Sequence, residues 1–125
     1  MKYSPVQNFI NGKFVDASTQ KSLEVISPLD GNLLSKVPMS SAKDLDDAVK
    51  AAKAAFPVWS KTPIKERVQV FFRYKTLLER DLKELAALCS EENGKTISES
   101  IAEVEKSIEL TEFATSLPQL VTGEI

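Results

Sequence analysis

The chain has 125 residues, which is enough for one ordinary domain with a hydrophobic core and too few for two large domains. Sixteen basic and eighteen acidic residues give a net charge of -2, which provides no general attraction for nucleic acid or for an anionic membrane. One cysteine and the absence of histidine exclude an internal disulfide, an ordinary zinc site and any Ser-His or Cys-His nucleophile pair. No stretch approaches the roughly 18 apolar residues of a membrane helix, and the N-terminus has no apolar signal core. We therefore expect a soluble, cytoplasmic protein that is not an autonomous enzyme.

The first 40 residues have the pattern of short strands and turns. Asn11 and Gly12 stand between two apolar runs, and Asn-Gly is the favoured two-residue hairpin turn because both residues tolerate positive φ. A second strand pair is predicted over Leu23 to Ile26 and Leu33 to Val37, with a turn at Asp30-Gly31. Pro28 and Pro38 confine these strands to edges or strand ends.

From residue 41 onward the apolar residues follow a helical period. The first predicted helix begins with a capping box of Ser41 and Asp44 and ends at Pro57. Its apolar face consists of Leu45, Ala48, Val49, Ala52, Ala55 and Phe56. A long second helix is predicted from Thr62, as N-cap, and Pro63 to about Glu92. A third begins with a capping box of Thr96 and Glu99 and stops at Pro118. We thus predict two regions, residues 1-40 with strands and residues 41-125 with three helices, which together form one incomplete part of a domain.

The segment Gly94-Lys95-Thr96 raises the alternative of a phosphate-binding loop. That loop needs a further glycine five positions earlier and a preceding buried strand, but the position holds Cys89 within a helical pattern. We therefore interpret Gly94 as the left-handed stop of one helix, before the capped start of the next. Cys89 is interpreted as a small apolar residue of the helix stripe, not as a nucleophile.

The order of these motifs resembles the N-terminal portion of the aldehyde dehydrogenase superfamily. The resemblance rests on "FINGKFVDA", "VISPLDGNLLSKVP" and the long run from "DLDDAVKAAKAAFPVW" to "ENGKT", and it extends from about Gln7 to the end of the chain. The stretch "IELTEFATSLPQLVTGE" looks like the corresponding part of methylmalonate-semialdehyde dehydrogenases, which form an acyl-CoA. The resemblance implies an α/β fold and, for a full-length protein, oxidation of an aldehyde by NAD.

The resemblance assigns no catalytic or cofactor-binding residue to these 125 residues. In the family a cysteine thiolate attacks the aldehyde, hydride passes to NAD, and the thioester is released to water or to coenzyme A. The nucleophile, the oxyanion group and the cofactor loop belong to later segments of the family pattern. The resemblance therefore implies an inactive scaffold whose partners are the remainder of a dehydrogenase chain and sister subunits. NAD is not expected to bind this part alone.

Some family members hold a monovalent cation, and the resemblance carries three of its ligand positions over to this chain. These are the backbone carbonyls of Val25 and Ile26 and the side chain of Glu92. Oxygen ligands suit a hard cation. The remaining family ligand lies beyond Ile125, so the site would be incomplete, and we favour the interpretation of Glu92 as a solvated helix-end residue.

Two further interpretations compete with the scaffold. Basic and aromatic residues along the second helix could form a nucleic-acid face, but acidic residues alternate with them, so we expect a salt-bridged solvent face. A stand-alone helical interaction module without enzymatic activity is the second alternative. In either case, apolar helix faces without a covering sheet predict that the isolated chain associates with itself.

Overall fold

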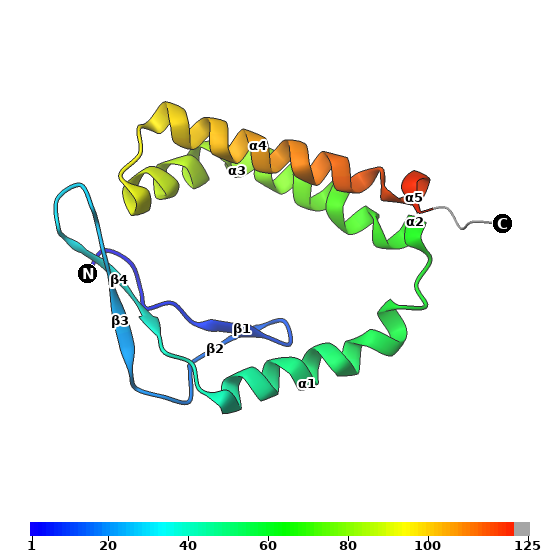
Figure 1. The fold of residues 1–125 in the computed structure, drawn as a ribbon, viewed down its shortest axis with the longest axis horizontal. Coiled ribbons are helices and arrows are strands. Elements are labelled where there is room, and N and C mark those ends of the chain that lie inside the picture. The colour runs from blue at the N-terminus through cyan, green and yellow to red at the C-terminus, as the bar shows by residue number, and fades with distance from the viewer. Residues whose placement is uncertain (122–125) are drawn as a thin grey trace. The chain divides into compact units, whose positions relative to one another are not determined.

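The computed structural model describes residues 1-121, and the chain forms two compact units, Met1-Ser60 and Lys61-Ile125. The first unit contains four strands and a helix, in the order β1 (Asn8-Ile10), β2 (Lys13-Val15), β3 (Ser22-Ile26), β4 (Leu33-Pro38) and α1 (Ala42-Trp59). The second contains α2 (Ile64-Arg67), α3 (Gln69-Asn93), α4 (Ile97-Thr115) and α5 (Leu117-Leu120). Figure 1 shows this succession of strands followed by helices.

The hairpin of β1 and β2 has the predicted two-residue turn. The strands are antiparallel and pair Phe9 with Phe14, whose rings lie 5.0 Å apart. Asn11 has φ 52° and Gly12 has φ 75°, as a turn with two left-handed residues requires. The Asn11-Gly12 prediction is therefore confirmed.

Substitution of Gly12 by alanine should destabilise this hairpin by about 1-2 kcal/mol, because a side chain disfavours the left-handed region. No atom lies within 4 Å of the Cβ that alanine would add, so the cost is conformational rather than steric. Urea unfolding followed by the fluorescence of Trp59, the single tryptophan, measures it. The control Asn11→Gly should change stability little, since glycine adopts positive φ without strain. Equal stability of the Gly12→Ala variant and the wild-type chain would contradict the turn geometry.

The second strand pair, β3 with β4, is also confirmed, with Pro38 at the last position of β4. The register shifts between Val25 and Ile26, which marks a bulge. The N-terminal segment runs alongside β4, where the backbone N-H of Tyr3 donates to the carbonyl of Leu34 and that of Val6 to the carbonyl of Lys36, both at 2.8 Å. Leu34 and Ser35 of β4 are buried.

Helix α1 begins as predicted and ends later than predicted. Ser41 is its N-cap, and the reciprocal bonds of the capping box with Asp44 are both present. The prediction that Pro57 ends the helix is wrong, because α1 continues through Pro57 to Trp59. Proline removes one N-H donor. The last turn is still closed by the backbone N-H of Ser60, which donates to the carbonyl of Phe56 at 2.8 Å.

The predicted second helix is divided in the structure. Helix α2 begins at Ile64, and its cap residue is Pro63 rather than Thr62, because Pro63 has an extended backbone with ψ 140°. Val68 separates α2 from α3 and keeps helical dihedral angles. The three long predicted helices are therefore present, and α2 and α5 are additional short ones. Helix α4 ends at Thr115, and Pro118 lies inside α5.

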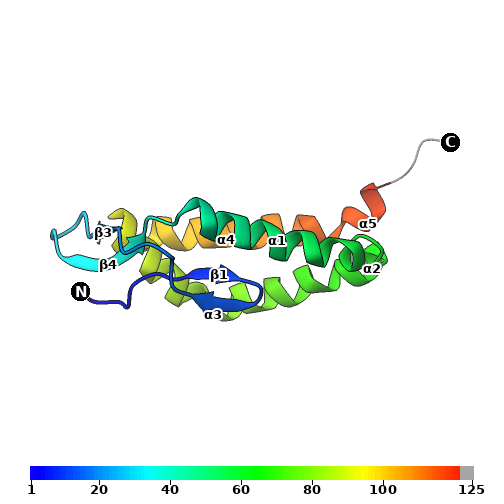
Figure 2. The same ribbon diagram turned by 90° about the horizontal axis from the view of Figure 1, so that it is seen from below.

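The segment Gly94-Lys95-Thr96 joins two helices, as predicted. Gly94 has φ 71° and its N-H donates to the carbonyl of Ser90, which closes α3. Thr96 and Glu99 form both bonds of a capping box at the start of α4. Helices α3 and α4 consequently run side by side in opposite directions (Figures 1 and 2). Ala86 on α3 and Ser100 on α4 are both fully buried.

The first compact unit ends at Ser60, because α1 packs against β1 and so belongs with the strands. The predicted division into residues 1-40 and 41-125 follows instead the change from strands to helices, and it stays a prediction.

Candidate functional site

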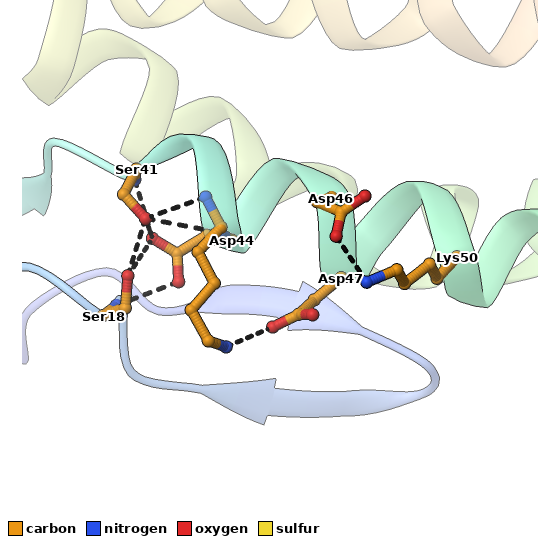
Figure 3. Close-up of polar contacts among 7 residues, drawn as sticks. Ser18, Ser41, Asp44, Asp46, Asp47 and Lys50 are labelled. Atoms are coloured by element: carbon orange, nitrogen blue, oxygen red, sulfur yellow. Dashed lines mark hydrogen bonds and ion pairs between the residues drawn. The ribbon is translucent and has the colours of Figure 1, made fainter.

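A polar cluster joins the start of α1 to the loop after β2 (Figure 3). The backbone N-H of Ser41 donates to Asp44 Oδ2 at 2.7 Å, and the backbone N-H of Ser18 donates to Asp44 Oδ1 at 2.9 Å. The Ser18 hydroxyl adds a bond of 3.0 Å to Oδ2. Ser41 and Asp44 were predicted to pair, but Ser18 was not, since it lies 26 residues from Asp44 and no local motif connects them.

The hydrogen bonds of this cluster stabilise the ionised form of the Asp44 carboxylate. The backbone N-H of Ser41, followed by that of Ser18, lowers the pKa of Asp44 from 3.8 to about 2. A general acid or base near neutral pH needs a pKa close to that pH. Asp44 is therefore a structural anchor that holds the loop against α1, and it is unsuited to proton transfer.

A shallow groove of about 380 Å³ lies beside the anchor, between β1 and the first turns of α1. Its walls include Phe9, Ile10 and Leu45. At its edge the Ser40 hydroxyl donates to Asn8 Oδ1 at 3.0 Å, while the buried Asn8 Nδ2 has no acceptor among the described residues. Asp44 is the one titratable group among the lining residues of this groove.

A second polar cluster lies where α3 meets α4. Cys89 is half-buried, and its Sγ lies 3.8 Å from both Glu103 Oε2 and Asn93 Nδ2. Lys95 forms an ion pair with Glu103, which raises the pKa of Lys95 and lowers that of Glu103. Cys89 thus differs from a fully buried core residue in having polar neighbours. Its thiol donates to the Glu103 carboxylate and lies beside the Asn93 amide, so the contacts of Cys89 are polar.

The structure places the predicted cation ligands in different units. Val25 and Ile26 lie at the bulge of β3 in the first unit, and Glu92 is an exposed residue in the last turn of α3. The cation site therefore stays a prediction. Within residues 1-121, no three His, Cys, Asp or Glu side chains gather as a metal ligand set. In the same residues, no helix combines the length and hydrophobicity that crossing a membrane requires.

The basic residues of α3 include several with acidic partners. Lys75 Nζ lies 3.1 Å from Glu79 and 3.0 Å from Glu112, and Arg80 pairs with the neighbouring Asp81 at 2.7 Å. These ion pairs agree with the expected salt-bridged solvent face. Lysine and arginine side chains paired in this way differ from the unpaired basic surface that would bind the phosphates of a nucleic acid.

Comparison with solved structures defines the class of protein. Methylmalonate-semialdehyde dehydrogenase from Oceanimonas doudoroffii matches 98% of this chain with a TM-score of 0.92 and 34% identity. An NAD-dependent benzaldehyde dehydrogenase from Corynebacterium glutamicum matches 96% with a TM-score of 0.89 and 29% identity. The chain covers 25% and 26% of those two structures. The fold is thus the α/β fold seen in aldehyde-oxidising dehydrogenases, as predicted.

The sequence comparison establishes the family. The model of the aldehyde dehydrogenase family matches residues 14-125, and the chain belongs to this family. Malonate-semialdehyde dehydrogenase from Lacticaseibacillus casei is 44% identical over 119 residues, which are 95% of this chain and 24% of that protein. A malonate-semialdehyde dehydrogenase of Shouchella clausii is 42% identical over the same length. The chain therefore spans about a quarter of the length of these curated relatives.

Proposed function

We propose that this chain is the non-catalytic N-terminal scaffold of an NAD-dependent, CoA-acylating aldehyde dehydrogenase of the cytoplasm. The observation that supports the proposal most directly is the similarity to semialdehyde dehydrogenases over 95% of the chain but only 24% of their length. Within residues 1-121 the Asp44 carboxylate is held by backbone donors at a pKa of about 2, far from the neutral range that acid-base catalysis needs. The scaffold would form part of a cofactor-binding domain and contact the remaining chain and sister subunits.

The proposed substrate of the whole protein is methylmalonate semialdehyde or its close analogue malonate semialdehyde. The curated relatives from Lacticaseibacillus casei and Shouchella clausii carry the name malonate-semialdehyde dehydrogenase. The solved enzyme of Oceanimonas doudoroffii is named methylmalonate-semialdehyde dehydrogenase. A structure of similar fold from Sinorhizobium meliloti contains bound NAD. These substrates differ by one methyl group, which changes binding in an apolar pocket by about 1-3 kcal/mol.

A chimera tests this proposal. The 125-residue chain is joined to the segments that follow the matched region in the Lacticaseibacillus casei relative, and NADH formation is measured with malonate semialdehyde, NAD and coenzyme A. We expect activity from the chimera and none from the 125-residue chain alone. The complete relative is the positive control. NADH production by the isolated chain, or a folded chimera without activity, would contradict the proposal.

A further inference from the structure

The chain contains two Asn-Gly pairs, Asn11-Gly12 and Asn93-Gly94, and each pair is followed by a lysine. Asparagine before glycine can lose its side-chain amide without an enzyme, because glycine has no Cβ and its backbone nitrogen can reach the side-chain carbonyl carbon. Both asparagines are exposed. The following residues and the exposure are thus alike in the two pairs, so a difference in their reactivity has to come from backbone conformation and hydrogen bonds.

The end of α3 holds the Asn93-Gly94 pair in place. The N-H of Gly94 donates to the carbonyl of Ser90 at 2.8 Å, and Asn93 Nδ2 donates to the carbonyl of Cys89 at 3.1 Å. Asn93 is also the last residue of the helix. The Gly94 nitrogen can approach the side-chain carbon of Asn93 only after these bonds break and the last turn of the helix opens. This pair is therefore protected.

The Asn11-Gly12 pair has a different environment. It forms the two-residue turn between β1 and β2, beyond Ile10 and Lys13, the last paired residues of the hairpin (Figure 1). Within residues 1-121, neither the Asn11 side chain nor the Gly12 N-H forms a hydrogen bond. Each strand has only three residues, so few bonds have to break before the turn opens.

We propose that Asn11 is a site of spontaneous deamidation in this chain, and that Asn93 is protected from the same reaction. The Gly12 nitrogen attacks Asn11 Cγ, the bond between Cγ and Nδ2 breaks, and ammonia leaves with the proton of the Gly12 N-H. Water then opens the cyclic imide. Cleavage of the bond from nitrogen to Cγ gives aspartate. Cleavage of the bond from nitrogen to the backbone carbonyl carbon gives isoaspartate, in which the main chain continues through the side chain.

The isoaspartate product is incompatible with the hairpin. It adds an extra carbon to the main chain of a turn that consists of two residues with φ 52° and φ 75°. The pairing of Phe9 with Phe14 depends on the length of that turn, so we expect the register to be lost. Both products also add a negative charge to the chain.

The deamidation site goes beyond the proposed function and is tested separately from it. The two reacting groups are neighbours in the sequence, so the reaction needs no partner, and water is its only co-reactant. Its readout is the mass of two peptides, whereas the proposed function concerns NADH formation by a longer chain. An unreactive Asn11 would overturn the deamidation site and leave the chimera experiment unaffected.

Mass spectrometry of the aged chain provides the test. The folded 125-residue chain is kept at mildly alkaline pH and then digested with trypsin under mildly acidic conditions, which limit further deamidation. Cleavage after lysine gives the peptides Tyr3-Lys13 and Glu84-Lys95, and both end in Asn-Gly-Lys. We expect the deamidated fraction of Tyr3-Lys13 to grow at least several-fold faster than that of Glu84-Lys95. Chromatography separates the aspartate and isoaspartate forms.

A variant and an unfolded sample are the controls. Asn11→Gly removes the reacting amide, and loss of the mass change in this variant shows that Gln7 and Asn8 of the same peptide do not cause it. In concentrated guanidinium chloride both Asn-Gly pairs lose their hydrogen bonds, so the two peptides should deamidate at similar rates. Far-UV circular dichroism checks that the first sample is folded and the second is not.

Each outcome bears on the proposal. Faster deamidation of Tyr3-Lys13 in the folded chain, together with similar rates in guanidinium chloride, supports it. Equal rates in the folded chain, or an equally large difference that persists in guanidinium chloride, would overturn it. An Asn11 amide that stays intact in the folded chain but is lost in the unfolded one would do the same, because the turn would then protect Asn11.

Discussion

Substitution of Ala86 by leucine is expected to lower the free energy of unfolding by about 1-3 kcal/mol, because a larger side chain overpacks a filled interior. Ala86 lies on α3 and has no exposed surface. The facing helix α4 also has a small, fully buried residue, Ser100, and Val104 is 9% exposed. Because α3 packs on α4, a leucine at the buried position 86 would have to displace the surrounding side chains or move the two helices apart.

The matched control is the adjacent residue on the same helix. Ala87 is exposed, so Ala87→Leu should change the free energy of unfolding by less than about 0.5 kcal/mol. Urea unfolding followed by far-UV circular dichroism reports on both variants, since helices dominate the second unit. Equal stability of the Ala86→Leu and Ala87→Leu variants would contradict the close packing of α3 on α4.

Substitution of Asp44 by asparagine should destabilise the first unit above about pH 4. Near pH 2 most of this difference in stability between the variant and the wild type should disappear. The folded pKa of about 2 lies below the ordinary value of 3.8, so the ionised carboxylate stabilises the folded state above pH 3.8. That stabilisation falls as the pH drops through the folded pKa and the carboxylate becomes protonated. Asparagine also presents an N-H group to one of the backbone donors, which leaves that donor without its acceptor.

The pH dependence is measured by urea unfolding with Trp59 fluorescence at several pH values between 2 and 7. The control is Asp46→Asn, which removes a carboxylate from an exposed site on the same helix, where its ion pair is with Lys50. We expect the Asp46→Asn variant to have a smaller loss of stability at pH 7 than the Asp44→Asn variant. A difference between the wild type and Asp44→Asn that stays constant down to pH 2 would show that the carboxylate charge contributes nothing to the anchor.

The features that were predicted correctly depend on neighbours within a few residues. The left-handed turn of Asn11 and Gly12, the helix stop at Gly94 and the capping boxes at Ser41 and Thr96 are all confirmed. Each of these features depends on hydrogen bonds and backbone conformations within three or four residues, so a short stretch of sequence is sufficient to specify it.

Pro57 and Thr62 show where local rules are insufficient. A proline in the last turn of a helix costs one donor, and the bond between Ser60 and Phe56 keeps the turn closed. At the next helix, Pro63 takes the extended conformation of a cap residue, so the helix begins one position later than its motif suggests. Such boundaries depend on the balance of several weak bonds and therefore vary by a residue or two.

The amino-acid sequence by itself determined the succession of hairpins and helices and the membership in the aldehyde dehydrogenase family. Helical periodicity and turn formation depend on residues that are close together in the sequence, so they can be predicted without coordinates. Only the tertiary structure decided that Ser18 binds Asp44, and that α1 turns Asp44, Ala48 and Ala51 toward the rest of the first unit. These arrangements depend on contacts between distant segments, because a periodic pattern defines the faces of a helix but not which face the rest of the chain covers.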